Sequence, residues 1–454
     1  MMTKRTAVIV KHRPVLLMVL ITGFALSAIG SAPAYAQGAA DARITSGLFS
    51  GGNKPVTSRQ HFDFLFDLSE TFDTHLPEQF APTLTPDNPQ TGGYSTLLKA
   101  SSNYERHRSR TDIQASASGA FRYYASLDEA RVVSGAAVVG LTSRLSRNTR
   151  LQLDQNVAYS PSYLYQLLPT AAPADPGALP TTAPDYSIGE SRSVSSGTSV
   201  AFSHDAIAGG TVRANGGVNR TDFSEPSEAR PNVLVYLLEG KYFRPISRST
   251  DLSVGYTHRN GEFGYGGWTT EQGFPLGLTY RGPLGITRRA ELQFNVIPEL
   301  IDIPQSALFA ARTGREYRIA ADASLLYPFL RSWHARARFT RRLEYIASLP
   351  QPVFSNGTIL ALEGHATRRT HISLSATYAN DRSLQQERPL SFDTYAGDAH
   401  VRYALSRKVG IYGGYLYYHY RSTAGAELLE GIPARFGRTG LRVGLMLFVP
   451  VMGR

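Results

Sequence analysis

Apolar and polar residues alternate along the C-terminal part of the chain. From 394 to 405, apolar or small residues at every second position are separated by polar ones such as Asp398 and Arg402. The same alternation returns at 441–447, where leucine and valine are separated by Arg442 and smaller residues. A period of two predicts strands with one apolar and one polar face. Runs of about 9–11 residues suit a tilted strand that crosses a bilayer, whereas soluble strands average about 5–6.

A turn pattern recurs between these runs. An apolar residue ends one run, a short turn with a hydroxyl residue and arginine follows, and a new alternating run begins. Copies occur at 145–149, 246–250, 366–370 and 405–408, with weaker ones at 286–289 and 330–332. The arginines at positions 248, 288, 331, 369 and 407 are 40, 43, 38 and 38 residues apart. A repeat near 40 residues also fits propeller blades of four strands. Each unit here contains only two long strands, which favours a meander of hairpins with short turns at one end.

The pattern predicts an all-β protein: a transmembrane antiparallel up-and-down β-barrel of about 18 strands, within residues 60–449. The strands are expected at 60–72, 93–105, 111–125, 131–145, 149–160, 191–204, 211–223, 232–246, 250–261, 275–287, 289–301, 315–328, 333–346, 357–367, 370–381, 393–405, 409–421 and 435–449. An even number of strands puts the start of the first strand and the end of the last strand on the side of the short turns, which we expect to be periplasmic. The alternative is a soluble sandwich or propeller with an exposed apolar face.

Charged residues keep to one face of most predicted strands. In 289–296, for example, Leu292 and Phe294 alternate with Glu291 and Gln293. A charge facing lipid at mid-depth costs about 2–4 kcal/mol, which explains why the charges share one parity. Tyrosines at strand ends match the aromatic girdles of membrane barrels.

Three segments outside the regular pattern have their own expected roles. A basic head, the apolar stretch 15–29 and a small-residue site ending at Ala36 predict a signal peptide over 1–36. A membrane anchor is the alternative, but fifteen residues are fewer than the roughly 20 of a helical span. Residues 37–59 are expected to form a flexible periplasmic lead-in. Six prolines in 161–190 exclude a regular strand and predict an extracellular loop, either solvated or folded into the barrel mouth.

Composition narrows the function. The chain has no cysteine, so disulfides and thiolate metal sites are excluded. Of its eleven net positive charges, four lie in the basic head, which leaves seven. The other basic residues are interleaved with acidic ones, so we expect no nucleic-acid partner. No phosphate-binding loop, nucleophile elbow or paired-histidine metal motif occurs after the signal peptide, and we expect no cofactor.

With its signal peptide, long alternating strands, short turns and Tyr-rich final hairpin, the chain resembles Gram-negative outer-membrane β-barrels of the porin-like type over about 60–449. The resemblance implies an outer-membrane location and three kinds of partner: membrane lipids with lipopolysaccharide, the outer-membrane assembly machinery, and hydrophilic solutes. It also allows a homo-oligomer, and some proteins of this type accompany exopolysaccharide genes. One departure concerns the C-terminus. Many members end on an aromatic residue, whereas this chain continues for six residues after Phe448.

An 18-stranded barrel encloses a lumen wide enough for water, and its polar face supplies the candidate site. The pore-lining candidates are Arg336, Arg338, Arg342, Arg402, Arg442, Glu316, Asp322 and Asp398. The arginines of 334–342 form the densest basic segment and suggest a ladder that guides anions. The favoured alternative is that they neutralise Glu316 and Asp322 on the neighbouring strand.

We therefore predict an outer-membrane pore that passes hydrophilic solutes with weak selectivity, including export of a saccharide as one option. A structural or surface-interaction barrel with a plugged lumen is the second hypothesis. An outer-membrane lipid hydrolase is the third: His258 lies in a segment weakly similar to that of outer-membrane phospholipases, but the serine expected after it is replaced by Arg259. We expect no catalytic residue, and His365, His371 and His400 are weak metal candidates because no carboxylate or Cys pattern accompanies them.

Overall fold

The structure is a computed structural model of the 454-residue chain. It describes residues 48–49, 59–74, 92–125, 130–160, 192–206, 209–226, 231–264, 267–285, 287–303, 314–330, 332–345, 352–384, 391–422 and 435–453. The predicted signal peptide at 1–36, the Pro-rich segment at 161–190 and most of the lead-in lie outside this part of the chain.

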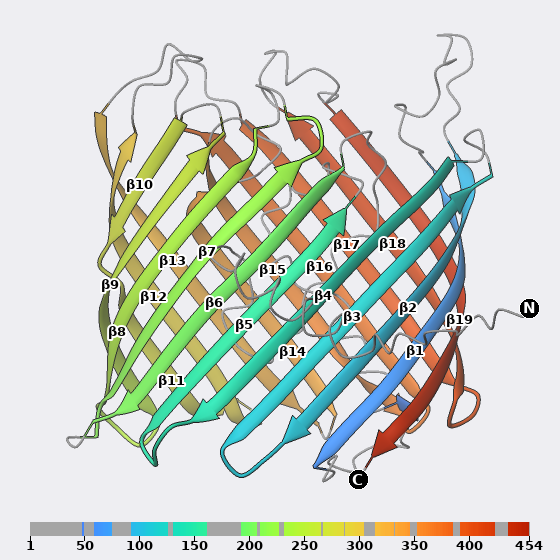
Figure 1. Ribbon diagram of the computed structural model, residues 1–454, viewed down its shortest axis with the longest axis horizontal. Helices are drawn as coiled ribbons and strands as arrows, with labels where there is room; N and C mark the ends of the chain where they lie inside the picture. The colour runs from blue at the N-terminus through green and yellow to red at the C-terminus, as the bar shows by residue number, and fades with distance from the viewer. Residues whose placement is uncertain are drawn as a thin grey trace, which may run out of the picture.

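Nineteen β-segments form one continuous sheet. They are β1 (Gln60–Asp73), β2 (Gly93–His107), β3 (Thr111–Tyr124), β4 (Ala130–Arg144), β5 (Thr149–Ser160), β6 (Ser193–Asp205), β7 (Thr211–Phe223), β8 (Val233–Pro245), β9 (Thr250–Phe263), β10 (Gly267–Gly273), β11 (Leu276–Leu284), β12 (Thr287–Ile303), β13 (Gly314–Phe329), β14 (Trp333–Glu344), β15 (Val353–Thr367), β16 (Thr370–Ser383), β17 (Ser391–Ala404), β18 (Val409–Ser422) and β19 (Arg435–Gly453). Successive strands pair antiparallel, and β1 also pairs with β19, which closes the sheet into a barrel of tilted strands (Figure 1).

Segments β10 and β11 are two parts of one strand. Both pair with β9 and with β12, and the register on β9 is continuous, from Gly273 opposite Thr257 to Leu276 opposite Val254. The interruption lies at Pro275, which has no N–H to donate to a ladder. The neighbouring strands still bond across it, because Gly255 N–H donates to the Pro275 carbonyl (2.9 Å). The barrel therefore has eighteen strands, as predicted.

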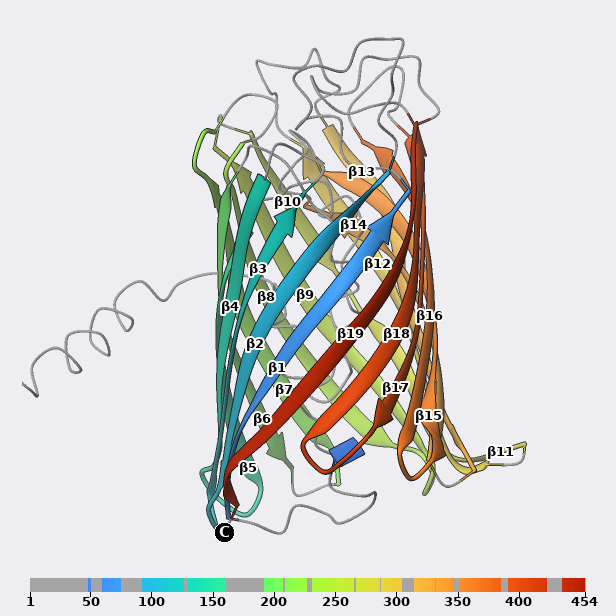
Figure 2. The same cartoon turned by 90° about the vertical axis from the view of Figure 1, so that its right-hand side faces the viewer.

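Short turns join the strands at one end of the barrel, which we call the turn end, and the opposite end is the loop end. Strand β1 begins and β19 ends at the turn end (Figure 2). Backbone geometry is unusual at three turn positions, where φ is positive: Gly209 (78°), Gly285 (58°) and Leu330 (54°). Glycine adopts this region without steric cost, whereas a side chain there is strained.

The predicted all-β barrel fold is confirmed, and the predicted strands lie within a few residues of those observed, with two differences. The tenth strand begins at Gly267, well before the predicted start at 275, because Pro275 lies inside the strand rather than ahead of it. Strand β19 continues to Gly453, beyond the predicted end at 449. Pro450 fits there because β18 pairs with β19 only as far as Leu447, so no ladder bond on that side is lost. Among the described residues, no helix has the length and apolar character needed to cross a membrane.

Candidate functional site: the inner face of the barrel

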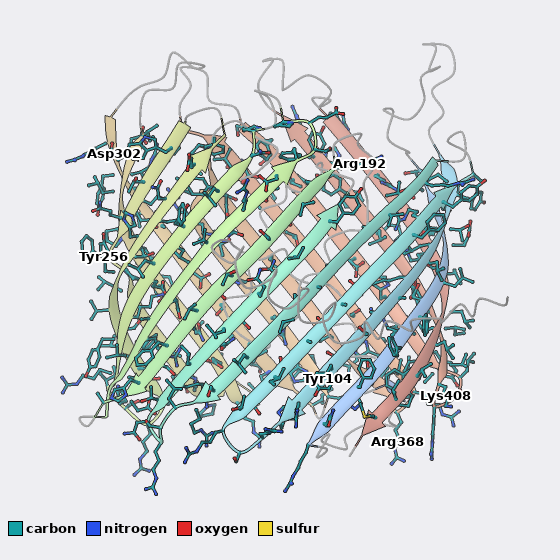
Figure 3. All side chains as sticks on the ribbon, viewed as in Figure 1. Tyr104, Arg192, Tyr256, Asp302, Arg368 and Lys408 are labelled. Atoms are coloured by element: carbon teal, nitrogen blue, oxygen red, sulfur yellow. The ribbon has the colours of Figure 1, made fainter. Side chains whose placement is uncertain are left out.

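The two faces of the barrel wall differ in chemistry. One face carries exposed large apolar side chains on nearly every strand, including Leu98, Phe294, Ile319 and Val443, which is 69% exposed. Tyr256 belongs to this outer face and points away from the wall (Figure 3). A continuous exposed apolar surface of this extent is unfavourable in water, whereas it matches the hydrocarbon layer around a transmembrane barrel. The chain thus forms a barrel of the outer-membrane type, and charged side chains in the middle of the strands lie on the inner face.

Many charges on the inner face lie beside an opposite charge on the same or the adjacent strand. Arg281 on β11 bridges two neighbours, with Nη1 2.8 Å from Asp251 Oδ2 and Nε 3.0 Å from Glu291 Oε1. Lys241 Nζ lies 2.7 Å from Glu239 Oε2 on the same strand. Opposite charges at cross-strand distance stabilise a sheet by about 0.2–1 kcal/mol per pair. The wall is therefore polar and charged without a large field of one sign.

The predicted arginine ladder is divided among separate partners. Arg338 donates from Nε (3.2 Å) and Nη2 (3.1 Å) to Asp322 Oδ2 on β13, which is the predicted cross-strand pairing. Arg336 Nη2 lies 3.5 Å from Glu363 Oε1 on β15 instead. Arg342 Nε donates to Glu344 Oε1 (2.5 Å) within its own strand.

The remaining pore-lining candidates lie apart from the ladder. Glu316 is not held by a ladder arginine, because Arg318 on the same strand lies 2.7 Å from its Oε2. Asp398 Oδ2 lies 2.8 Å from His400 Nε2 on β17. Arg442 on β19 donates from Nε to Thr71 Oγ1 (3.0 Å) on β1, and Arg402 is buried on β17. The eight candidates thus share the inner face but form no single cluster.

A buried ion pair joins the two strands that close the barrel. Arg438 on β19 donates from Nη2 to Asp73 Oδ2 (2.7 Å) and from Nε to Asp73 Oδ1 (3.2 Å). Both side chains have no exposed surface. The bidentate geometry matches the guanidinium fork to the carboxylate. This pair lies at the loop end of the seam, where Asp73 is opposite Gly440.

The loop end of β14 separates from β13 and crosses over the inner face of the neighbouring strands. Pairing of β14 with β13 stops at Arg341, opposite Ala321, whereas pairing with β15 continues to Glu344, opposite Val353. Beyond it, the Leu343 carbonyl accepts a hydrogen bond from Arg259 Nη2 on β9, 84 residues away in sequence. Tyr345 OH donates to the Thr269 carbonyl on β10 (3.3 Å). Segments β10 to β13 lie between β9 and β14 in the sheet, so these contacts form over the inner face of the wall.

This crossing gathers five charged side chains and one tyrosine, all buried or partly buried, which we call the crossing cluster: Arg259, Glu271, Glu299, Arg342, Glu344 and Tyr345. Arg259 Nε lies 3.1 Å from Glu271 Oε1, and its guanidinium carbon lies 4.5 Å from the centre of the Tyr345 ring. Burial, and next the negative Glu271, raise the pKa of Tyr345 well above its ordinary value, so its hydroxyl stays protonated and can donate. Three carboxylates face two guanidinium groups here, and Glu271 and Glu299 are buried.

An apolar patch interrupts the polar inner face at the turn end. Leu48 and Phe49 are helical and buried, and they pack against Leu65, Ala404, Tyr412, Met446 and Phe448. Phe49 stacks on Phe448 with ring centres 5.4 Å apart and planes within 9°. The lead-in 37–59 is predicted to be flexible and periplasmic, and these two of its residues are instead held inside the barrel. Phe448 faces inward, because it shares the parity of Arg442 and Met446 on β19. Its ring stacks on Phe49, and β19 continues past it to Gly453.

Sequence reasoning did not single out the crossing cluster or the Leu48–Phe49 contact. The partners of Arg259 lie 12, 84 and 86 residues away, on different strands, so no local spacing connects them. One feature of the sequence could have indicated the Leu48–Phe49 contact. Met446 and Phe448 are large apolar residues at inward-facing positions of the last strand, where the pattern otherwise places polar or small residues. Among the described residues, no group of three or more His, Cys, Asp and Glu side chains could hold a metal ion. The rings of His365 and His371 do meet, at 5.1 Å between centres.

No protein-family model and no curated protein sequence matches the chain. Solved structures resemble it at low identity. The FrpB iron transporter from Neisseria meningitidis (F5-1 variant) has a TM-score of 0.45 and 8% identity, covering 89% of this chain and 84% of that one. OpdQ from Pseudomonas aeruginosa has a TM-score of 0.42 and 8% identity, covering 87% and 98%. OccK11 (OpdR) from the same organism has a TM-score of 0.40 and 12% identity, covering 88% and 100%.

Proposed function

We propose that the protein is a bacterial outer-membrane channel for hydrophilic solutes. The observation that carries the proposal is the contrast between the two faces: apolar side chains cover the outside of a closed eighteen-stranded wall, and paired charges cover the inside. A barrel of this size has more interior volume than its own side chains fill. A wall of both signs favours water and polar solutes without rejecting either charge.

The turn end faces the periplasm in this proposal, and the loop end faces outward. Support comes from the two terminal strands, because β1 begins and β19 ends at the turn end (Figure 2). Short periplasmic turns and longer outward loops are the usual arrangement of such barrels. The pore-lining candidates Arg336, Arg338, Glu316 and Asp322 then lie on β13 and β14, the strands beside the crossing.

The crossing cluster is the proposed constriction. Tyr345 and Arg259 meet on the inner side of the wall, so they narrow the lumen at this level. The charges of the crossing cluster are largely paired with one another, so we expect the constriction to have no strong preference for either sign of charge. Export of a saccharide stays a prediction that no contact among the described residues tests.

The test is conductance of the refolded mature protein in a planar bilayer. We expect stepwise single-channel events, and we expect Tyr345→Ala to raise the unit conductance because it removes the ring that spans to Arg259. Tyr317→Ala is the matched control: it removes a tyrosine from the outer face, 66% exposed, and should leave conductance unchanged. A correctly folded barrel that conducts no ions would refute the channel function. Equal effects of the two substitutions would refute the place of the constriction.

A plugged structural barrel is the second candidate, and one observation favours it. Leu48 and Phe49 occupy an apolar patch on the inner face, so part of the chain preceding the barrel is held inside it. A plug predicts that wild-type protein is silent and that Phe49→Ala makes it conduct. A channel predicts conductance in both.

A further inference from the structure

The charged residues in the turns at the turn end all carry positive charge, whereas the inner face carries both signs. All eight charged residues in the described turns at the turn end are cations: Arg108, Arg110, Arg147, Arg248, Arg368, Arg369, Arg407 and Lys408. All eight are exposed, and no described carboxylate forms an ion pair with any of them. Arg368 and Lys408 extend from this rim of the barrel (Figure 3). We call this set the cationic rim.

The turns do not need these cations for their own geometry. In the turn at 405–408, the backbone N–H groups of Lys408 (3.2 Å) and Val409 (3.0 Å) donate to Ser406 Oγ. In the turn before β16, the N–H of Arg369 donates to Thr367 Oγ1 (3.2 Å). Hydroxyl residues thus satisfy the turn backbone, which leaves the guanidinium and ammonium groups available to an outside partner.

An exposed apolar residue occurs in four described turns at the turn end, and in three of them it precedes a cation of the rim. Leu145, Ile246 and Leu405 are exposed and lie two residues before Arg147, Arg248 and Arg407. Leu330 is 79% exposed and holds a positive φ of 54°, a strained conformation for leucine that no packing within the described protein explains. Each of these residues continues the apolar outer face to the edge of the barrel, so a membrane at that face would bury it.

We propose that the cationic rim binds anionic phospholipid headgroups in the leaflet on the turn side. In the turns at 145–147, 246–248 and 405–407, the leucine or isoleucine lies among the acyl-chain segments nearest the headgroups, and the cation two residues later reaches the phosphate level with its flexible stem. The spacing favours lipid over a soluble acidic partner, because the cations are continuous with the apolar belt rather than separated from it. The rim then fixes the depth of the barrel in the bilayer.

The two tryptophans of the chain make this testable, because they lie at opposite ends. Trp333 begins β14 at the turn end, beside the turn that contains Arg368 and Arg369, and Trp268 lies on β10 toward the loop end. Single-tryptophan proteins, Trp268→Phe and Trp333→Phe, would each be reconstituted in mixtures of phosphatidylcholine with brominated phosphatidylglycerol or brominated phosphatidylcholine. Quenching gives the relative binding constant of the two lipids at each reporter.

At Trp333 we expect phosphatidylglycerol to be favoured by about fivefold for each nearby cation at low salt. Arg368→Gln with Arg369→Gln should bring the ratio close to one, and so should high salt. Arg192→Gln with Arg382→Gln is the control: it removes the same charge from the loop end and should change nothing at Trp333 (Figure 3). Equal quenching by both lipids at Trp333 in the wild-type sequence would overturn the proposal. A preference that survives loss of Arg368 and Arg369, or one equally strong at Trp268, would also overturn it. None of these readouts depends on passage of a solute.

Discussion

The ion pair between Asp73 and Arg438 holds the seam at which the first and last strands meet. Replacing Asp73 with alanine would leave the Arg438 guanidinium buried with no exposed surface and without the carboxylate that accepts two of its hydrogen bonds. Breaking a buried pair from one side costs about 3–5 kcal/mol, because the surviving charge loses the carboxylate that offset its removal from water. We expect Asp73→Ala to lower the free energy of unfolding by that amount.

The double variant Asp73→Ala with Arg438→Met tests whether the loss of stability comes from leaving one buried charge without its counterion. Removing both charges restores an uncharged seam, and buried pairs replaced in this way often change stability little. We therefore expect the double variant to be at least about 2 kcal/mol more stable than Asp73→Ala alone. An exposed pair supplies the matched control: Asp222 lies 2.7 Å from Arg220, but the two side chains are 38% and 58% exposed. Asp222→Ala should cost no more than about 1 kcal/mol.

The assay is urea unfolding of the lipid-reconstituted barrel, followed by tryptophan fluorescence, with the midpoint and slope compared across the four proteins. An unchanged slope would show that the midpoint shift reports stability. If Asp73→Ala and Asp222→Ala shifted the midpoint equally, burial of the seam pair would not be the source of its strength. The same conclusion would follow if the double variant were as unstable as the single one.

Two further predictions concern the contact inside the barrel and the turns. Phe49→Ala removes the ring stacked on Phe448 and should release the Leu48–Phe49 contact, at a local cost of about 3 kcal/mol; faster amide hydrogen exchange confined to residues near 48 would show it, and unchanged exchange would contradict it. Gly209→Ala places a side chain at a φ of 78° where no atom lies within 4 Å, so its cost of about 1–2 kcal/mol is purely conformational. Gly240→Ala, which also meets open space but has no positive φ, should be close to neutral in the same urea titration.

The sequence predicts the wall of this barrel well because the wall is governed by local rules. Lipid outside and water inside impose a period of two on every strand, so parity places Val443 outside and Arg442 inside without knowledge of any neighbour. Turn residues then separate the strands. The predicted start of the tenth strand at 275 was wrong because proline usually lies at a strand boundary. Here the strand lacks one hydrogen bond at Pro275 and continues on both sides of it.

The site is harder to predict because its contacts are not local. Period-two parity indicates that Arg259 faces inward, but not that the end of β14 would leave β13 and cross to meet it. Whether Arg338 neutralises Asp322 or guides a solute depends on strand register, which sequence spacing leaves open. The structure shows the pairing with Asp322, whereas Glu316 is paired with Arg318 instead.

Closure between β1 and β19 has a consequence for biogenesis. The two strands are separated by almost the whole chain, and Asp73 meets Arg438 across 365 positions of sequence. Until β19 is in place, one edge of β1 presents unpaired N–H and C=O groups that can recruit other polypeptides, although β2 pairs with its other edge. A product that lacks β19 cannot close the barrel, so we infer that such chains must be chaperoned or degraded before they reach a bilayer.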